Sequence, residues 1–287
     1  MMNDDYELLD SGDGRKLERF GKYVLARPCS QAMWRPCKSE ADWNRADASF
    51  DREDGNHWHG RGNLPKEWTV ETAGIRFKLG GTDFGHLGIF PEQREQWRWI
   101  RDEVERRCGG GRGAVSVLNL FAYTGGATAA AAKAGAAVCH VDAAKGMVAA
   151  AKENLKLSGL EDAPVRYIVD DCKKFVEREI RRGHKYDGII MDPPSYGRGP
   201  GGEVWKLEEC AHELITLAAR LMSDEPLFFL VNSYTTGLSP MTMGYMVMDA
   251  MELRGKVCAE ELGLHVTQTG LYLPAGASAR WTAESEN

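Results

Sequence analysis

The chain has 287 residues, of which 43% are hydrophobic and 27% charged, so it is long and apolar enough to bury a large core. Its 36 lysines and arginines against 42 aspartates and glutamates give a formal net charge of −6, which argues against a purely electrostatic grip on nucleic acid. No stretch approaches the roughly 18 apolar residues of a membrane span, and the acidic start MMNDDYELLD lacks the pattern of a secretory signal, so we expect a cytoplasmic protein that does not associate with membranes.

The cysteines are scattered along the chain and contain no CxxC pair. This spacing argues against a disulfide framework and against a zinc site built from thiolates. We therefore expect reduced thiols and no metal. The seven residues are Cys29, Cys37, Cys108, Cys139, Cys172, Cys210 and Cys258.

Residues 1–80 are polar, interrupted by turns, and rich in tryptophan. Short apolar pieces predict a small β-rich appendage, which is a candidate substrate-binding region. Its tryptophans could stack on bases, or they could bury apolar area that joins the appendage to its neighbour. The sequence leaves both roles open for Trp34, Trp43, Trp58 and Trp68.

Beyond the appendage, residues 81–287 are predicted to form one large domain. From Val115 onward, short apolar runs alternate with segments of helical spacing, which is typical of a parallel α/β sheet. The domain is therefore predicted to belong to the α/β class, with a Rossmann-like, doubly wound and mostly parallel sheet. The apolar runs are 115–120, 137–142, 165–170, 186–192 and 226–232, and the clearest helical stripes run from Met147 to Leu155 and from Leu207 to Leu221.

The first strand is followed by a glycine turn. In such sheets, ligands bind outside the carboxyl ends of the strands. The turn reads Phe121-Ala122-Tyr123-Thr124-Gly125-Gly126, and a helix of small residues follows it. Paired glycines let the backbone approach a ligand closely. The turn lacks the GxGxxG of a dinucleotide fold and the GK[ST] of a P-loop, which disfavours a pyrophosphate or triphosphate ligand.

Acidic residues end the second and third apolar runs. Asp142 lies within the roughly 20-residue window after Gly125 in which a carboxylate accepts hydrogen bonds from both hydroxyls of a ribose. Asp171 could accept from an adenine amino group, while the backbone N–H of Cys172 meets a ring nitrogen. Both aspartates could instead cap the helices that follow them. Glycine turn and Asp142 together indicate a nucleoside ligand.

The fourth run ends in Asp192-Pro193-Pro194-Ser195-Tyr196. The prolines stiffen the turn and withhold N–H groups, which leaves the carboxylate of Asp192 and the nearby carbonyls as acceptors. Tyr196 is placed to stack on a flat substrate. A purely structural turn is the alternative. The position of this turn directly after a fourth parallel strand favours a reaction centre.

These motifs resemble those of the class I S-adenosylmethionine-dependent methyltransferases, and among them the bacterial large-subunit ribosomal RNA base methyltransferases. The resemblance spans residue 85 to the C-terminus. It rests on GIFPEQREQWRWI (88–100), NLFAYTGGATAAAA (119–132), Asp142, DDCKKF (170–175) and MDPPSYGRG (191–199).

The resemblance implies a seven-stranded sheet, S-adenosylmethionine as the cofactor, RNA as the partner, and a role for each matching residue. Asp142 would hold the ribose of the cofactor. Asp171 and Cys172 would hold its adenine. Asp192 and Pro194 would border the methyl-acceptor pocket, with Asp192 also next to the cofactor. The residues that would line or approach the methionine end are Phe90, Arg94, Phe121, Tyr123, Thr124 and Gly125.

One departure from the resemblance bears on the acceptor atom. Cytosine-C5 methylation needs a cysteine thiolate, supplied after the fifth strand, where this chain reads VNSYTTG (231–237). A hydroxyl is a much poorer nucleophile than a thiolate at neutral pH, so a base nitrogen is favoured over cytosine C5. The predicted catalytic residues for the methylation of ribosomal RNA are Asp192, Pro194 and Tyr196.

Three alternatives stay open at this point. The acceptor could be a protein or a small molecule, as the acidic charge would suit. The chain could also be a non-catalytic RNA-binding assembly factor that retains the fold, or, more distantly, a nicotinamide-dependent dehydrogenase. The sequence gives no indication of the oligomeric state.

Overall fold

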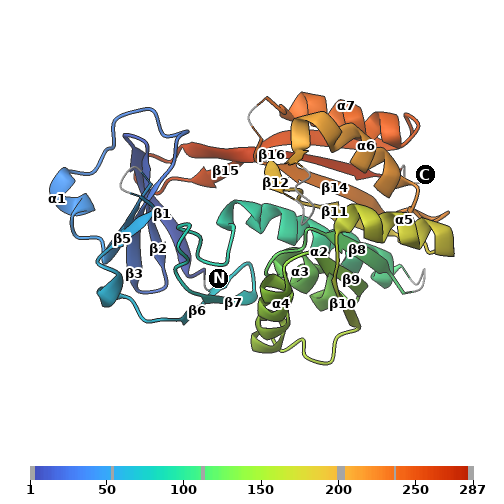
Figure 1. Cartoon of the computed structure of the whole chain (residues 1–287), viewed down its shortest axis with the longest axis horizontal. Helices are drawn as coiled ribbons and strands as arrows, with labels where there is room; N and C mark the ends of the chain where they lie inside the picture. Colours follow the sequence, from blue (N-terminus) through green and yellow to red (C-terminus); the bar gives the residue numbers. More distant parts are fainter. Residues whose placement is uncertain (1–3, 53–54, 111–113, 199–203, 236, 284–287) are drawn as a thin grey trace. The chain divides into compact units, whose positions relative to one another are not determined.

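The computed structural model describes residues 4–52, 55–110, 114–198, 204–235 and 237–283 (Figure 1). It contains two compact units. The first consists of Met1–Arg94, Glu153–Gly159 and Gly263–Ala275, and the second of Glu95–Lys152, Leu160–Leu262 and Gly276–Asn287.

The division between the units lies at Arg94 instead of near residue 80, where the sequence pattern changes. The segment after residue 80 is tied to earlier parts of the first unit. The indole Nε1 of Trp58 donates to the carbonyl of Thr82 at 2.8 Å, and Nη1 of Arg27 donates to the carbonyl of Gly85 at 3.1 Å. Such contacts join residues far apart in the chain, so local composition does not reveal them.

A five-stranded sheet forms the centre of the first unit, as the predicted β-rich appendage requires. Its order is β1-β2-β3-β4-β5, antiparallel except for the parallel pair β3–β4. Its strands are β1 (Tyr6–Gly12), β2 (Arg15–Phe20), β3 (Tyr23–Pro28), β4 (Ala48–Asp51) and β5 (His57–His59). The unit also contains α1 (Glu40–Trp43), η1 (Arg61–Asn63), η2 (Pro91–Gln93) and the hairpin β6 (Trp68–Thr72) and β7 (Ile75–Leu79).

Two segments from later in the chain complete the first unit. The backbone N–H of Lys78 in β7 donates to Oδ1 of Asn154 at 2.8 Å, and that of Arg76 donates to Oγ of Ser158 at 3.0 Å. The N–H of Thr267 donates to the carbonyl of Leu8 in β1 at 2.9 Å. The first unit is therefore built from three separate stretches of sequence.

Tryptophans anchor the loops of the first unit. The Nε1 of Trp43 donates to the buried carboxylate of Asp10 at 3.2 Å, and that of Trp34 donates to the carbonyl of Ser11 at 3.0 Å. The ring of Trp68 packs edge-on against Tyr23. These contacts support the packing role that the sequence left open.

A seven-stranded sheet forms the second unit, in the order β10-β9-β8-β11-β14-β16-β15. Its first five strands pair in parallel, and β16 joins β14 antiparallel, which confirms the predicted doubly wound, mostly parallel α/β fold. All five predicted apolar runs are strands of this sheet. The strands are β8 (Ser116–Leu120), β9 (Ala137–Asp142), β10 (Val165–Val169), β11 (Gly188–Met191), β14 (Phe228–Ser233), β15 (Lys256–His265) and β16 (Tyr272–Thr282).

Helices cover both faces of this sheet (Figure 1). On one face, side chains of α5, α6 and α7 form a hydrophobic core with Leu118, Val141 and Ile189 of the strands. On the other face, Trp99 of α2 packs against Phe228. The helices are α2 (Arg94–Gly109), α3 (Gly126–Lys133), α4 (Lys145–Leu157), α5 (Cys172–Arg182), α6 (Leu207–Ala219) and α7 (Pro240–Ala250), and a hairpin of β12 (Tyr196–Arg198) and β13 (Val204–Lys206) precedes α6.

Within the described parts of the chain, no helix is long and apolar enough to cross a membrane. The same parts contain no group of three or more histidines, cysteines or carboxylates that could hold a metal ion.

Candidate active site

Four neighbouring strands of the seven-stranded sheet end at the same edge. In the parallel registers, Val169 of β10 is opposite Asp142 of β9, and Met191 of β11 is opposite Leu120 of β8. Backbone bonds continue the pairing past the strand ends, from the Asp170 N–H to the carbonyl of Asp142 at 3.1 Å. Parallel strands share one direction, so the acidic residues that follow them gather at this edge.

The turn after β8 has an uncommon backbone. Phe121, Tyr123 and Gly125 have φ angles of 55°, 48° and 86°, in the left-handed region. This region is rarely occupied by residues other than glycine, and it costs on the order of 1 kcal/mol or more where it is held. The N–H of Phe121 donates to Sγ of Cys172 at 3.2 Å, and that of Tyr123 donates to Oδ2 of Asp142 at 2.9 Å. The start of α5 and the end of β9 thus hold the turn in a fixed shape.

The predicted small-residue helix follows this turn directly. Gly125, in the left-handed conformation, is the residue before α3. Thr124 is buried. Thr128 in α3 accepts a hydrogen bond from Nδ2 of Asn119 at 2.9 Å, which fastens the helix to β8. The alanines 129–132 of α3 are buried, so small side chains let the helix pack against the sheet.

Asp142 binds two backbone N–H groups before α4 and keeps acceptor capacity. Its Oδ1 accepts from the N–H of Ala144 at 2.8 Å, next to α4, while its Oδ2 accepts from Tyr123. A carboxylate offers about four acceptor sites, and these two bonds use two of them. The half-buried carboxylate therefore fits the two hydroxyl donors of a ribose.

Asp171 and Cys172 lie at the start of α5. The Asp171 side chain accepts from the N–H of Lys174 at 2.9 Å and caps the helix, and its carboxylate is exposed. Asp170 instead forms an ion pair with Arg178. Cys172 is buried beneath the turn at Phe121, and burial raises the pKa of its thiol. The expected adenine contact concerns its backbone N–H, at the first residue of α5, and not this thiol.

The turn after β11 contains the three predicted catalytic residues. Asp192 continues the sheet, since its N–H is 3.4 Å from the carbonyl of Leu120, and the following Pro194 is exposed. Tyr196 begins β12 with 53% of its surface exposed. The structure therefore brings Asp192 to the same sheet edge as Asp142.

Two residues that the sequence analysis missed support this turn. The Nε1 of Trp205 in β13 donates to the carbonyl of Pro194 at 2.7 Å. The Oγ1 of Thr235 donates to Oγ of Ser195 at 2.8 Å. Thr235 follows β14, where the sequence was searched only for a cysteine, and Trp205 lies beyond a glycine-rich stretch with no pattern of its own.

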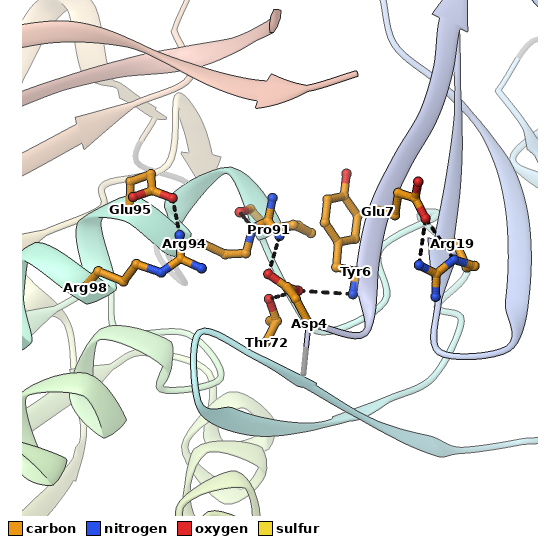
Figure 2. A network of polar contacts seen from close by, with 9 residues as sticks. All are labelled: Asp4, Tyr6, Glu7, Arg19, Thr72, Pro91, Arg94, Glu95 and Arg98. Atoms are coloured by element: carbon orange, nitrogen blue, oxygen red, sulfur yellow. Dashed lines mark hydrogen bonds and ion pairs between the residues drawn. The ribbon is translucent and has the colours of Figure 1, made fainter. Parts of the chain in front are cut away.

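Phe90 and Arg94 belong to the first unit, and their part in cofactor binding remains a prediction. Figure 2 shows Arg94 pointing toward Asp4, with Nη1 2.8 Å from the carboxylate. The guanidinium also lies over the ring of Tyr6, and its Nε donates to the carbonyl of Pro91 at 3.0 Å. The ring of Phe90 is edge-on to the imidazole of His86.

Comparison with known proteins gives matches throughout the chain. The family described as S-adenosylmethionine-dependent methyltransferase matches residues 47–216. The crystal structure of a SAM-dependent methyltransferase from Agrobacterium tumefaciens is 37% identical, with a TM-score of 0.90, over 98% of this chain and 91% of that one. A SAM-dependent methyltransferase from Streptococcus mutans shares the fold at 19% identity and a TM-score of 0.74, over 98% of this chain and 75% of that one.

Curated relatives match over shorter parts of their length. Ribosomal RNA large subunit methyltransferase K/L of Shewanella frigidimarina is 31% identical over 159 residues, which is 55% of this chain and 21% of that protein. Ribosomal RNA large subunit methyltransferase I of Escherichia coli is 27% identical over 217 residues, which is 67% of this chain and 52% of that protein. The chain thus spans between about a fifth and a half of these relatives.

Proposed function

Because the chain belongs to the S-adenosylmethionine-dependent methyltransferases, we propose that it methylates a base of ribosomal RNA, at a ring or amino nitrogen in preference to cytosine C5. S-adenosylmethionine, the cofactor of the family, supplies a methyl group on a sulfonium that is already a good leaving group. The names of the curated relatives support RNA as the acceptor. Such a substrate would place the protein in the cytoplasm, with the ribosome.

The residues proposed to hold the cofactor follow the first three strands. Asp142 would accept from the ribose hydroxyls and Asp171 from the adenine amino group, next to the N–H of Cys172. The rigid turn would surround the methionine end. Its residues in this role are Phe121, Tyr123, Thr124 and Gly125.

The acceptor base is proposed to bind at the turn after β11. Tyr196 exposes half of its surface and would stack on the base. The carboxylate of Asp192 would accept a hydrogen bond from the base, which orients the attacking nitrogen and receives its proton. Pro194 would border the pocket for the acceptor base. Alignment of this kind supplies most of the catalysis when the leaving group is already activated.

One observation carries the proposal: Asp192 follows a strand that pairs directly with β8, whose turn is bound to Asp142. Asp192 and Asp142 thus follow strands on either side of β8, and the turn after β8 lies between them in the strand order. The serine and threonines after β14 lack the thiolate that C5 chemistry requires.

The test combines acceptor identification with a point variant. Tritiated S-adenosylmethionine is offered with ribosomal RNA, whole-cell protein and metabolites, and nucleosides from ribosomal RNA of cells with and without the protein are compared by mass spectrometry. We expect label in RNA and one missing modified nucleoside. Label in protein or metabolites alone would replace the proposal, and cofactor binding without any transfer would indicate a non-catalytic factor.

The variant Asp192→Ala is expected to lose turnover while its affinity for S-adenosylhomocysteine stays within a few-fold of wild type. Asp162→Ala, at an exposed aspartate in the loop before β10, serves as the matched control and should keep full activity. Wild-type turnover in Asp192→Ala would remove this residue from the mechanism.

A further inference from the structure

A small cavity with basic and aromatic walls lies within the first unit, apart from the residues assigned above except Phe90. Its volume is about 130 Å³. We call it the basic cavity. The wall residues that matter here are Lys16, Arg27, Arg52, Phe84, His86 and Glu92.

The cations of the basic cavity are held in place. Nε and Nη2 of Arg27 bind Oε2 of Glu18 at 2.8 and 2.7 Å, and Nη1 binds the carbonyl of Gly85. Lys16 is 3.2 Å from the other oxygen of Glu18, which is fully buried. Arg52 adds a third, exposed cation to the lining, beyond the two that Glu18 binds. A guanidinium keeps further N–H donors beyond the bonds that Arg27 makes.

One oxygen of a second carboxyl group, Oε2 of Glu92, is buried at this cavity without a hydrogen-bond partner among the described residues. Burial raises the pKa of Glu92, against the opposing effect of Lys16. His86 lines the cavity together with these three cations, and burial, followed by Arg27, Arg52 and Lys16, lowers the pKa of its imidazole. A buried carboxyl without a partner is costly unless a ligand supplies one.

Aromatic groups surround the same space. Phe84 exposes 71% of its surface, although it is a large apolar residue on the wall of a cavity. Phe50 closes another wall beneath Gly85, where a Cβ would lie 2.5 Å from the ring. Gly85 has a φ of 76°, so its backbone and the absence of a side chain both preserve this shape.

The volume of the basic cavity and the chemistry of its walls indicate the kind of ligand. A volume of 130 Å³ is the space of about four water molecules at roughly 30 Å³ each, well below the roughly 300 to 1,000 Å³ of pockets for whole small molecules. It suits one flat ring system. A nucleobase edge offers donors and acceptors side by side, which matches Glu92 beside Arg27. Inorganic phosphate and carboxylate side chains offer chiefly acceptors and no flat face for Phe84.

We propose that the basic cavity binds one base of single-stranded RNA, with Glu92 and Arg27 on its edge, Phe84 against its face, and Arg52 on a flanking phosphate. The inference rests on the proposed function, since it specifies how the RNA substrate is recognised. This base is distinct from the acceptor base that we propose to stack on Tyr196.

Binding of short single-stranded RNA oligonucleotides of each base, followed by fluorescence anisotropy, tests the proposal. Phe84→Ala should weaken binding about fivefold to a hundredfold, the effect of removing one stacked base. Arg52→Gln should flatten the slope of log affinity against log salt by about 0.7, the value for one lost contact to a single strand. Glu92→Gln should change the preference among the four oligonucleotides about fivefold or more.

Exposed positions in the same unit provide matched controls. Met33→Ala removes a side chain that is 85% exposed outside the basic cavity, and Lys22→Gln removes an exposed cation. Both should bind like wild type. If Phe84→Ala and Arg52→Gln match these controls, the proposal is wrong. The proposal would also be overturned if poly-aspartate or inorganic phosphate competed as strongly as RNA while Phe84→Ala had no effect. The basic cavity would then be an unspecific anion-binding site.

The two proposals fail in different ways. Ribosomal RNA that accepts no methyl group from the wild-type protein contradicts the proposed function, whereas oligonucleotide binding is measured without turnover. Wild-type methylation with an unchanged KM for RNA in Phe84→Ala would contradict the basic cavity alone.

Discussion

The indole ring of Trp97 occupies the space where any side chain on Gly126 would begin. A Cβ added to Gly126 would lie 2.6 Å from Cζ2 of Trp97, and Trp97 is itself buried. Gly126 is the first residue of α3, next to the turn with left-handed φ angles. The contact therefore couples the packing of α2 to the position of the candidate cofactor turn.

We expect Gly126→Ala to destabilise the protein by about 1 to 3 kcal/mol, the usual cost of overpacking a buried site. Gly146→Ala in α4 is the control, because beyond its chain neighbours and the backbone of its own helix nothing lies within 4 Å of the added Cβ. Replacing a helical glycine with alanine should stabilise by about 0.5 to 1 kcal/mol. Urea denaturation measures both variants. Equal stability of the two would contradict the steric argument.

Asp142→Ala is expected to weaken binding of S-adenosylhomocysteine by about 1 to 3 kcal/mol, since the substitution removes an acceptor and leaves polar groups without a partner. The N–H groups of Tyr123 and Ala144 lose their acceptor at the same time. Isothermal titration calorimetry gives the affinity, with the exposed Asp162→Ala as the reference. Unchanged affinity would separate Asp142 from the cofactor.

The buried His140 should make stability depend on pH. Burial lowers the pKa of His140 from 6.5 to about 4, and Nδ1 of its ring is 2.9 Å from Oγ1 of Thr128. An unfolded chain binds this proton below about pH 6.5, whereas the folded protein binds it only near pH 4. Stability contributed by the neutral ring is therefore complete above pH 6.5 and falls between pH 6.5 and 4, by about 3 kcal/mol in total.

Denaturant unfolding between pH 4 and 8 measures this dependence. His140→Gln should be less stable at pH 7 but should lose less stability over that range. His265→Gln changes an exposed histidine and should keep the wild-type slope. If the free energy of unfolding of His140→Gln changed with pH as steeply as that of the wild type, other groups would cause the pH dependence.

Glu18 stabilises the first unit through charge. Its buried carboxylate binds Arg27 and Lys16 and accepts from the hydroxyl of Tyr6 at 3.0 Å. Removing one partner of a buried ion pair leaves a buried charge uncompensated, so Glu18→Gln should cost about 3 to 5 kcal/mol. Glu40→Gln breaks an exposed pair with Arg15 and should cost less than about 1 kcal/mol. Similar melting temperatures for the two variants would refute this assignment.

The sequence predicted the seven-stranded unit well because its signals are local. Buried parallel strands are short apolar runs, and the helices between them have apolar stripes, so the five predicted runs coincide with β8, β9, β10, β11 and β14. The shared direction of parallel strands also sufficed to predict that Asp142 and Asp192 would meet at one edge.

Other features depend on contacts that no local pattern encodes. The ion pair of Arg94 with Asp4 joins residues at opposite ends of the first unit's main segment, and the bond from Trp205 to Pro194 spans a hairpin that periodicity did not indicate. The division of the units at Arg94 likewise follows from tertiary hydrogen bonds such as that of Arg27 with Gly85.

The bridge between Leu8 and Val266 affects how the protein is made as well as how it is held together. Translation releases the N-terminal strands long before residues 263–275, which belong to the same compact unit. β1 must therefore wait until residues 263–275 have been synthesised, and pairings of such long sequence separation form slowly. Ribosome-bound chains that stop before residue 263 should leave the edge of β1 open to chaperones, and the second unit can acquire its central parallel strands first.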